Sequence, residues 1–540
     1  MHHNIKNITI VGGGTSGWMT AAGIAKLVPN VKLTLVESPV IPTIGVGEST
    51  IGHINIFLTM LGLKDEDWMP YCNATYKTSI KFIDFRENPT EKPHKFHYPF
   101  GVFDFTDKPR GVMEWFVART TDPTIDPSNF AEFFHDSILM TDQNKLTKNE
   151  NHEIRGFNFK HDTAYHMDAA LFGEWLRDNI CLPSGMTHII DTVTDIVQRD
   201  DGSIEKIGTE SNGYLEADLY IDCTGFKSLL LDQTLKTPFI SFHDTLLNDR
   251  AVATVIPYID KEQEMENYTS CTAIECGWVW NIPLWHRIGT GYVYSSKFAT
   301  EAEAEEQLRN HLKSNRMLFP DSNRADAAEF RHIKIRHGVH ERAWVKNVVG
   351  IGLANGFIEP LESTGLMLTH EGIVKLCSTL IMRDGHVSNY DVDLFNYGFQ
   401  EQIMGFKDFI SQHYALSHRN DTPYWKEVSG NITYSRATDS VTSLSGLNHG
   451  ATSQSDLGFR LHRTRRFDQG MGGIIYIAAG MGYNPLESNF MRYEDARLME
   501  NIEERKKVYL NWLSHREQAM KIIAELPTHY EFLKTYIHKP

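Results

Sequence analysis

Several features that mark whole classes of protein are missing from this sequence. It has only six cysteines in 540 residues, and Cys271 and Cys276 are the only two that lie close together. A disulfide scaffold and a zinc site of paired Cys and His residues are therefore not expected; we expect free thiols, a reducing cytoplasmic compartment and no metal ion. The longest nearly apolar stretch, residues 472–482, is too short to span a bilayer. No apolar signal core precedes the first expected strand.

Basic residues are fewer than acidic residues in this sequence. The chain has 53 Lys and Arg residues against 69 Asp and Glu residues, which gives a net charge of −16. An acidic surface repels phosphate backbones and anionic lipids, so neither nucleic acid nor a membrane is expected as a partner. Glycine and proline are near average usage, at 39 and 20 residues, and 41% of the chain is hydrophobic. This composition excludes collagen-like repeats and wholesale disorder, and it supplies a large core.

The chain opens with alternating strand and helix patterns. Residues 7–11 are typical of a buried strand, residues 18–28 of an Ala-rich helix, and residues 31–37 of a second strand. This order predicts a parallel sheet in an α/β fold. Further strands are expected at residues 76–85, 219–223, 252–256, 278–282, 291–296 and 348–353.

The pattern becomes helical after about residue 372. The best helical segments are 395–413 and 499–514, and a polar stretch at 439–455 is typical of a loop or lid. Residues 120–162 are polar and mixed, which indicates an insertion over the core. We therefore predict one large domain over residues 1–410, carrying that insertion, and a mostly helical region over residues 411–540.

A glycine loop at residues 12–17 has the spacing GxGxxG between the first strand and the first helix. Gly12 permits a tight turn, Gly14 lets the backbone approach a pyrophosphate, and Gly17 lets helix and sheet pack closely. Glu37, 20 residues past Gly17, suits the hydroxyls of an adenosine ribose and disfavours a 2′-phosphate. The pattern therefore favours FAD or NAD over NADP, the alternative being a glycine turn that binds no ligand.

Two of the ten tryptophans, Trp278 and Trp280, lie two residues apart in an expected strand that Pro283 ends. Side chains at this spacing face the same side of a sheet, so the two indoles form one bulky surface. A core strand and a wall against an aromatic ligand explain this pattern equally well.

The glycine loop and the motif Trp278-Val279-Trp280-Asn281-Ile282-Pro283 resemble those of the flavin-dependent tryptophan halogenases. Further matching segments follow in the same order at residues 45–50, 73–77, 164–169, 221–226, 357–365, 408–410 and 413–414. The resemblance covers roughly the first 430 residues. It implies a Rossmann-like FAD-binding domain of the flavoprotein monooxygenase type, an interleaved substrate layer and a helical C-terminal region.

The resemblance also implies the catalytic pair. Lys77 matches the family's essential lysine, which hydrogen-bonds hypohalous acid or becomes a haloamine and so positions electrophilic halogen beside the substrate. Pattern alone favours an exposed lysine face at this position. Glu362 matches the second catalytic residue, which polarises the hypohalous acid or takes the ring proton; taken alone it is a cap or a surface group. Thr364 and Gly365 match the halide site.

The remaining site residues implied by the resemblance fall into two groups. The residues expected to bind FAD, in its reduced form FADH2, are Gly12, Gly14, Ser16, Gly17, Glu37, Gly45, Gly47 and Glu48. Those expected to contact the substrate or to separate it from the flavin are His97, Phe100, Trp278, Trp280, Ile282 and Pro283. A satisfied structural histidine is an equally good interpretation of His97.

The partners expected with this family are a separate flavin reductase that supplies FADH2, a halide ion and a small aromatic substrate. The sequence has no second GxGxxG for a nicotinamide, which is consistent with a separate reductase. A homo-oligomer is also compatible with the sequence.

The C-terminal part departs from the enzymes that act on free tryptophan. Residues 467–476 replace the Tyr-Tyr and downstream Glu/Phe/Trp cluster that closes over the amino-acid group. We therefore expect a divergent member that uses reduced FAD, oxygen and halide to halogenate an electron-rich arene such as an indole or a phenol. The alternatives are a one-component flavin-dependent aromatic monooxygenase and, without catalysis, a flavin-binding scaffold.

Overall fold

A computed structural model describes residues 2–40, 47–101, 117–119, 121–431, 476–477, 479–482 and 501–539. The contacts within the chain group its residues into two units, each built from three segments. Unit 1 comprises residues 1–74, 165–243 and 334–404, and unit 2 comprises residues 75–164, 244–333 and 405–540.

Unit 1 contains a six-stranded sheet with the order β21-β22-β13-β2-β3-β9. Its strands are β2 (Asn7–Val11), β3 (Lys32–Glu37), β9 (Thr187–Ile190), β13 (Leu219–Asp222), β21 (Trp344–Val345) and β22 (Val348–Gly350). All neighbours pair in parallel except β21 with β22. Almost every residue of the central strands β2 and β13 is buried, as expected where both faces of a parallel sheet are covered.

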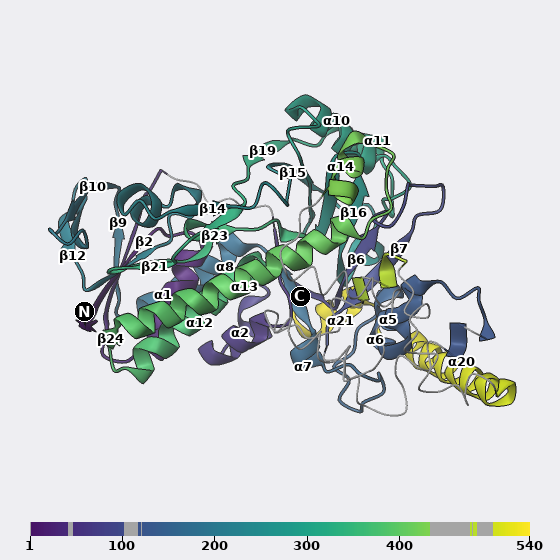
Figure 1. The fold of residues 1–540 in the computed structure, drawn as a ribbon. Helices are drawn as coiled ribbons and strands as arrows, with labels where there is room; N and C mark the ends of the chain where they lie inside the picture. The colour runs from purple at the N-terminus through teal and green to yellow at the C-terminus, as the bar shows by residue number, and fades with distance from the viewer. Residues whose placement is uncertain are drawn as a thin grey trace. The chain divides into compact units, whose positions relative to one another are not determined.

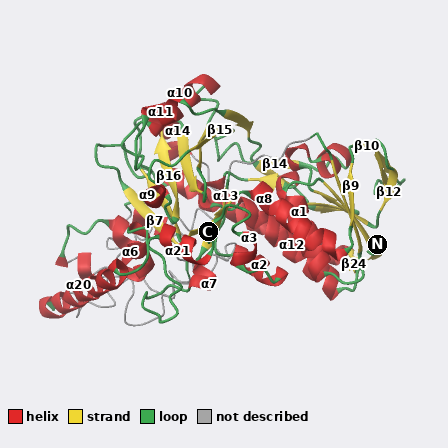
Figure 2. Cartoon of the chain, turned by 180° about the vertical axis from the view of Figure 1, so that it is seen from behind, coloured by secondary structure: helices red, strands yellow, loops and turns green. Residues whose placement is uncertain are grey.

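Helices α1 (Thr15–Leu27), α8 (Ala169–Leu176) and α12 (Gly365–Met382) gather beside this sheet (Figure 2). A Cβ atom at Gly23 would lie 2.6 Å from Ile373 Cγ2, so glycine permits the close packing of α1 on α12. Helix α13 (Asn389–Ala415) runs beside α12 (Figure 1), where Lys375 Nζ donates to Gln402 Oε1 at 3.1 Å.

The other strands of unit 1 form small sheets. They are β1 (His2–Asn4) with β24 (His386–Ser388), β4 (Glu48–Ser49) with β8 (Ala164–Met167), β10 (Val193–Gln198) with β11 (Ile204–Thr209) and β12 (Gly213–Glu216), and β14 (Phe239–Ser241) with β20 (Gly338–His340) and β23 (Gly356–Phe357). Short helices complete the unit: α2 (Ile54–Leu61), α3 (Asp65–Trp68), η2 (Arg177–Cys181), η3 (Leu182–Ser184), η4 (Gly225–Lys227), η5 (Leu229–Thr234), η6 (Gly352–Ala354) and η7 (Pro360–Glu362).

Unit 2 contains a seven-stranded mixed sheet with the order β19-β15-β18-β17-β16-β6-β7. Its strands are β6 (Ser79–Ile83), β7 (Lys95–Pro99), β15 (Arg250–Ile256), β16 (Tyr268–Ile274), β17 (Gly277–Pro283), β18 (Ile288–Tyr294) and β19 (Arg331–Lys334), with the short β5 (Thr75–Lys77) just before β6. Strands β16 and β6 pair in parallel, whereas β15, β18, β17 and β16 are successive antiparallel neighbours.

The helices of unit 2 are η1 (Pro127–Asn129), α5 (Phe130–Phe134), α6 (Asp136–Asp142), α7 (Phe159–Asp162), α9 (Lys261–Glu264), α10 (Glu301–Leu312), α11 (Ser322–Asp326), α14 (Pro423–Asn431), α20 (Ile502–Ala524) and α21 (His529–Tyr536). Four of them, η1, α5, α6 and α7, lie in the segment 120–162, where the sequence predicts a polar insertion.

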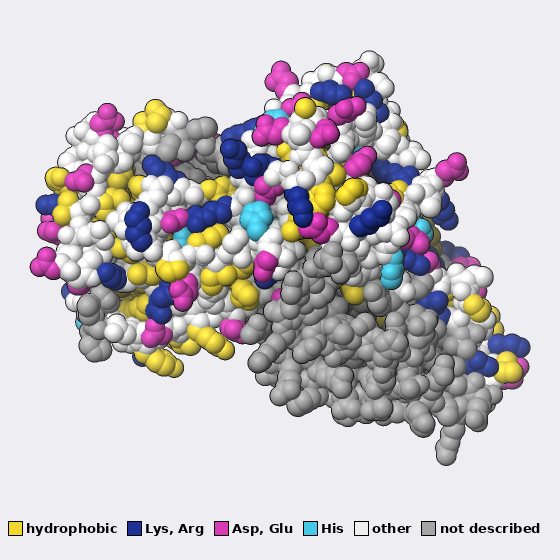
Figure 3. Space-filling view, turned by 45° about the horizontal axis from the view of Figure 1, so that its top comes forward, with side chains coloured by type: hydrophobic (Ala, Val, Ile, Leu, Met, Phe, Trp, Pro, Cys, Tyr) yellow, Lys and Arg dark blue, Asp and Glu magenta, His cyan; other side chains and the backbone are white. Residues whose placement is uncertain are grey.

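The predicted α/β class and the helical C-terminal region are confirmed. The strand predicted at 76–85 is divided into β5 and β6 at Thr78, whose N–H donates to the carbonyl oxygen of Asn267 at 2.8 Å. The expected loop at 439–455 lies outside the described residues, and the division at residue 410 stays a prediction. Within the described residues, no helix is both long and apolar enough to cross a membrane. Figure 3 shows acidic and basic side chains interspersed on the face it presents.

Candidate active site

Two glycines of the loop after β2 are required by the protein's own packing. Gly12 has φ +110°, and a Cβ there would lie 2.4 Å from the carbonyl oxygen of Cys223. A Cβ at Gly17 would lie 1.9 Å from the carbonyl oxygen of Gly12. These positions confirm the expected tight turn and the close approach of helix to strand, since no larger residue fits either one.

Gly14, at the start of α1, has a different reason to be glycine. A Cβ there would meet no atom within 4 Å, and no side chain caps the helix at this residue. The first amides of a helix lack partners within the helix and carry a partial positive charge. The open space beside Gly14 therefore fits a pyrophosphate. Ser16 lies in the first turn of α1, and its hydroxyl oxygen would be 2.3 Å from a Cβ at Gly352.

Glu37, at the end of β3, reaches back to the glycine loop. A Cβ at Gly13 would lie 1.5 Å from Glu37 Oε2. Oε1 lies 2.8 Å from Nε2 of His188 on β9, a residue that the sequence did not single out. His188 thus orients the carboxylate while Oε2 stays beside the loop, as an acceptor for ribose hydroxyls requires.

The next predicted flavin contacts begin β4. Gly45 lies outside the described residues, whereas Gly47 has φ +87°, a conformation that favours glycine. Glu48 pairs with Met167 of β8. Burial raises the pKa of the Glu48 carboxyl to about 7, so this group changes charge near neutral pH.

Glu362, Thr364 and Gly365 occupy the turn between η7 and α12. Glu362 ends the 3-10 helix and is 1% exposed, so the expected irregular turn is confirmed and the expected surface alternative is wrong. Ser363 follows in the left-handed conformation, with φ +57°. Its hydroxyl donates to the hydroxyl of Ser49 at 3.0 Å, which joins this turn to β4.

The predicted halide residues lie at the N-terminus of α12. The Thr364 hydroxyl is buried and has no hydrogen-bond partner among the described residues. Gly365 begins the helix, where amides are unpaired and the dipole favours an anion. A Cβ at Gly365 would lie 4.0 Å from Glu48 Oε2. This donor set fits a halide, with the carboxyl of Glu48 close beside it.

Lys77, at the end of β5 in unit 2, is fully buried. Its ammonium lies 4.9 Å from the centre of the Phe100 ring, close enough for a cation–π contact. The exposed lysine face that the pattern favours is therefore wrong for this residue. Lysine is rarely buried without a functional or pairing reason.

Two hydrogen bonds hold the strand of Lys77 in place, and one of them involves His529, a residue that the sequence did not single out. The Thr75 hydroxyl donates to the carbonyl oxygen of Pro283 at 2.6 Å, which joins β5 to the end of the tryptophan strand. The Tyr76 N–H donates to Nε2 of His529 on α21 at 3.2 Å. His529 Nδ1 lies 2.9 Å from the carbonyl oxygen of Met265, so the ring is fixed at both nitrogens.

Trp278 and Trp280 of β17 are buried with their ring centroids 6.2 Å apart, and Ile282 and Pro283 complete the strand. Gly291, opposite Trp280 on β18, makes room for the second indole: a Cβ there would lie 2.3 Å from its ring. The two indoles therefore form one surface, as the spacing predicts.

The predicted site residues thus fall in both units. The glycine loop, Glu37, Gly47, Glu48, Glu362, Thr364 and Gly365 belong to unit 1, and Lys77, His97, Phe100, Trp278, Trp280, Ile282 and Pro283 belong to unit 2. Within the described parts of the chain, no three His, Cys, Asp or Glu side chains are grouped so that they could hold a metal ion.

Comparison with known proteins decides the family. The sequence profile of the tryptophan halogenases matches residues 7–464. The chain belongs to this family. The tryptophan 6-halogenase ThaL of Streptomyces albogriseolus is 36% identical over 443 residues, covering 79% of each chain.

Solved structures agree with this assignment. The apo structure of VirX1 has a TM-score of 0.88 and 42% identity, covering 99% of both chains. Tar14, a tryptophan C-6 flavin-dependent halogenase from taromycin biosynthesis, has a TM-score of 0.81 and 33% identity, covering 98% of this chain and 99% of its own. The predicted halogenase function is confirmed: the protein is a flavin-dependent halogenase, an oxidoreductase acting with halide and a flavin. The monooxygenase alternative finds no support in these comparisons.

Proposed function

We propose that this halogenase uses FADH2, oxygen and halide to halogenate an electron-rich arene such as an indole or a phenol, with Lys77 and Glu362 as its catalytic residues. The observation that carries the proposal is the burial of Lys77 beside the Phe100 ring, with its ammonium 4.9 Å from the ring centre. An ammonium held against an aromatic side chain at a buried position suits a group that handles an electrophile next to an arene.

FAD is the flavin proposed here. Gly12, Gly14, Ser16 and Gly17 would hold its pyrophosphate and Glu37 its ribose, while Gly45, Gly47 and Glu48 would contact it further along. The open space at Gly14 and the free oxygen of Glu37 support this placement. When bound, the reduced cofactor would activate oxygen, and oxygen is the oxidant that turns halide into hypohalous acid. A separate flavin reductase would supply FADH2.

Thr364 and Gly365 would hold the halide. The unpartnered hydroxyl of Thr364 and the unpaired amides at the start of α12 supply donors without a full positive charge. Chloride, bromide and iodide are all compatible with such donors.

The proposed chemical step is electrophilic substitution on the arene. Lys77 would hydrogen-bond hypohalous acid, or carry its halogen as a haloamine, while the ring attacks the halogen. The carbon–halogen bond forms as the halogen–oxygen bond of hypohalous acid breaks; with a haloamine, the halogen–oxygen bond breaks when the haloamine forms, and the halogen–nitrogen bond breaks in the attack by the ring. Glu362 would polarise the acid or take the ring proton as aromaticity returns, and that proton with the departing hydroxide makes water. Phe100 and His97 would contact the arene, and Trp278, Trp280, Ile282 and Pro283 would keep it from the flavin.

The proposed substrate is an arene other than free tryptophan, although the named relatives are tryptophan halogenases. The sequence at residues 467–476 supports this choice, because it lacks the cluster expected for the amino-acid group; of these, residues 467–475 lie outside the described residues. The six cysteines are all buried and none is joined in a disulfide, which supports the proposed reducing cytoplasmic compartment.

One experiment tests substrate and reaction together. The enzyme with FAD, a flavin reductase, oxygen and each halide is offered indole, phenol and free tryptophan, and products are identified by mass spectrometry. We expect halogenated indole or phenol to exceed halogenated tryptophan. Hydroxylated product that forms without halide would contradict the proposal.

A second experiment tests the role of Lys77. Lys77→Ala should lower halogenation at least about a hundredfold while FAD binding persists, as expected for a group required in the chemical step. Lys92→Ala is the matched control, because Lys92 is an exposed lysine of the same unit. Full halogenating activity in Lys77→Ala would disprove the assigned mechanism.

A further inference from the structure

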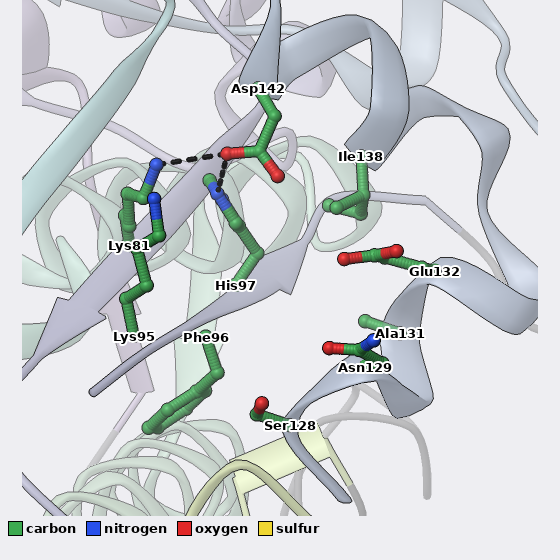
Figure 4. Close-up of a pocket in the computed structure, with 10 residues that line it drawn as sticks. All are labelled: Lys81, Lys95, Phe96, His97, Ser128, Asn129, Ala131, Glu132, Ile138 and Asp142. Carbon is green, nitrogen blue, oxygen red and sulfur yellow. Dashed lines mark hydrogen bonds and ion pairs between the residues drawn. The ribbon is translucent and has the colours of Figure 1, made fainter. Parts of the chain in front are cut away.

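Ser79, His97 and Asp142 form a continuous hydrogen-bonded chain in unit 2. The Ser79 hydroxyl lies 2.8 Å from His97 Nδ1, and His97 Nε2 lies 3.2 Å from Asp142 Oδ1. Figure 4 shows His97, from β7, and Lys81, from β6, both directed at the carboxylate of Asp142 at the end of α6. Both ring nitrogens of His97 are therefore engaged, one with a hydroxyl and one with a carboxylate.

The neighbouring groups determine the protonation states of His97 and Asp142. Burial and the ammonium of Lys81 lower the pKa of His97 below its ordinary value, although Asp142 opposes them. The neighbouring imidazole and ammonium hold the pKa of Asp142 well below its usual range, against the effect of burial. A neutral His97 thus donates its Nε2–H to Asp142 and accepts the Ser79 proton at Nδ1.

Other charged and titratable groups around His97 come from each neighbouring element. Lys81 Nζ donates to Asp142 Oδ1 at 2.9 Å and lies 4.6 Å from the centre of the Tyr268 ring. The Tyr268 hydroxyl donates to Glu266 at 2.5 Å, and its ring stands edge-on to His97 at 5.3 Å. Lys95 and Glu132 line the same pocket, and Glu132 pairs with Arg516.

The hydrogen-bonded chain runs from the buried Ser79 to Asp142 at the edge of a pocket. Ser79 is fully buried and His97 is 6% exposed, whereas the Asp142 side chain is 37% exposed. Asp142 borders a pocket with a volume of about 100 Å³. At the inner end, Ser79 follows Lys77 by two residues and His97 precedes Phe100 by three, and Lys77 and Phe100 are themselves in contact.

We propose that Ser79, His97 and Asp142 act as a base relay that deprotonates the hydroxyl of a phenolic substrate. The inference rests on the proposed function and narrows its substrate class from electron-rich arenes to those with an ionisable O–H. Ser79 is the proton-accepting group, His97 stores the proton, and Asp142 is a positioning residue that acts through His97. A hydroxyl, an imidazole and a carboxylate follow one another in this arrangement. The Ser79 hydroxyl gains the substrate proton and gives its own proton to His97, so the hydroxyl itself stays neutral.

The step balances within the site. The substrate O–H bond breaks and its proton joins Ser79 Oγ, while the former Ser79 proton moves to His97 Nδ1. The substrate becomes a phenolate, which is a stronger nucleophile toward electrophilic halogen, and His97 becomes an imidazolium stabilised by Asp142. The proton returns by the same route when the product leaves, so no external base is consumed.

The test compares phenol with anisole, its methyl ether, which has no proton to lose. Halogenation of both is measured by mass spectrometry from about pH 6 to 8, below the pKa of about 10 of a free phenol. In the wild type we expect a phenol-to-anisole rate ratio that changes little with pH. In Asp142→Asn the ratio should fall at least about tenfold at neutral pH and then rise with pH, because only phenolate formed in solution would react fast.

Two further variants complete the test. Ser79→Ala removes the hydroxyl at the inner end of the relay and should lower the same phenol-to-anisole ratio. This variant tests the relay if Asp142→Asn does not fold. Glu132→Gln is the matched control, a carboxylate of the same pocket outside the chain, and should leave the ratio unchanged. An unchanged ratio in the folded variants, or an equal loss with phenol and anisole, would overturn the relay. A wild type that halogenates no arene would overturn the proposed function itself.

Discussion

The hydroxyl of Ser363 donates a hydrogen bond to the hydroxyl of Ser49 at 3.0 Å. Both groups are buried, and they connect the strand that carries Glu48 to the turn that carries Glu362, Thr364 and Gly365. Ser363 holds a left-handed conformation at φ +57°, which is uncommon for a residue other than glycine, and this hydrogen bond is one of the contacts that fix the turn. The proposed halide site is therefore supported from the neighbouring strand.

Removal of this contact should weaken halide binding. Ser49→Ala leaves the buried Ser363 hydroxyl without that acceptor, a cost of about 1–2 kcal/mol, so we expect bromide affinity to fall about tenfold. FAD affinity should change much less. Bromide titration of the flavin fluorescence measures the effect, with Ser184→Ala, at an exposed serine of the same unit, as the control. Unchanged bromide affinity would show that the turn holds its shape alone.

Halide binding should also depend on pH through Glu48. Burial raises the pKa of this carboxyl to about 7, and its Oε2 lies 4.0 Å from the Cβ position of Gly365. Below that pKa the carboxyl is neutral; above it, the carboxylate repels an anion. We expect bromide affinity to fall about tenfold between about pH 6 and 8. Glu48→Gln should bind bromide with little dependence on pH, and a variant that keeps the full pH dependence would assign it to another group.

The fit of Trp280 against Gly291 should control how efficiently oxygen is used. A Cβ in Gly291→Ala would lie 2.3 Å from the Trp280 ring and 2.7 Å from the carbonyl oxygen of Val252, so the indole must shift. We expect a loss of about 1–3 kcal/mol in the free energy of unfolding. If the surface formed by the Trp278 and Trp280 indoles is disturbed, more hydrogen peroxide should form per FADH2 oxidised. A peroxidase assay measures this amount. Val255→Ala, at a 47% exposed position on β15, is the control.

His529 should contribute to stability in a pH-dependent manner. Burial lowers its pKa from 6.5 to about 4, so between these values the unfolded chain binds a proton that the folded chain does not. Stability from this residue is therefore present above pH 6.5 and is lost as the pH falls toward 4. Urea unfolding of His529→Ala at several pH values should show a weaker dependence over this range.

The same variant should be less stable at neutral pH. Without the His529 ring, the Tyr76 N–H loses its acceptor, which costs about 1–3 kcal/mol. Lys534→Ala, at an exposed position on the same helix, should unfold like the wild type. Equal unfolding curves for His529→Ala and Lys534→Ala would mean that α21 does not support the strand of Lys77.

Features that depend on neighbours in the chain could be predicted from the sequence. The turn at Gly12, the helix after Gly14 and the carboxylate of Glu37 follow from one strand-turn-helix-strand segment, in which local geometry sets every position. The shared face of Trp278 and Trp280 follows in the same way from the period of two along a strand. Resemblance to the halogenases singled out Lys77 and Glu362. Pattern alone favoured an exposed face for Lys77 and a cap or a surface group for Glu362, whereas both side chains are buried.

Only the tertiary structure decided which distant residues support the site. Thr75 meets Pro283 across 208 positions, Ser363 meets Ser49 across 314, and Asp142 meets His97 across 45. Such hydrogen bonds involve common residue types and leave no periodic or local signal in the sequence. They form because buried polar groups must find partners once the core is packed, and packing brings together residues that the chain order keeps apart.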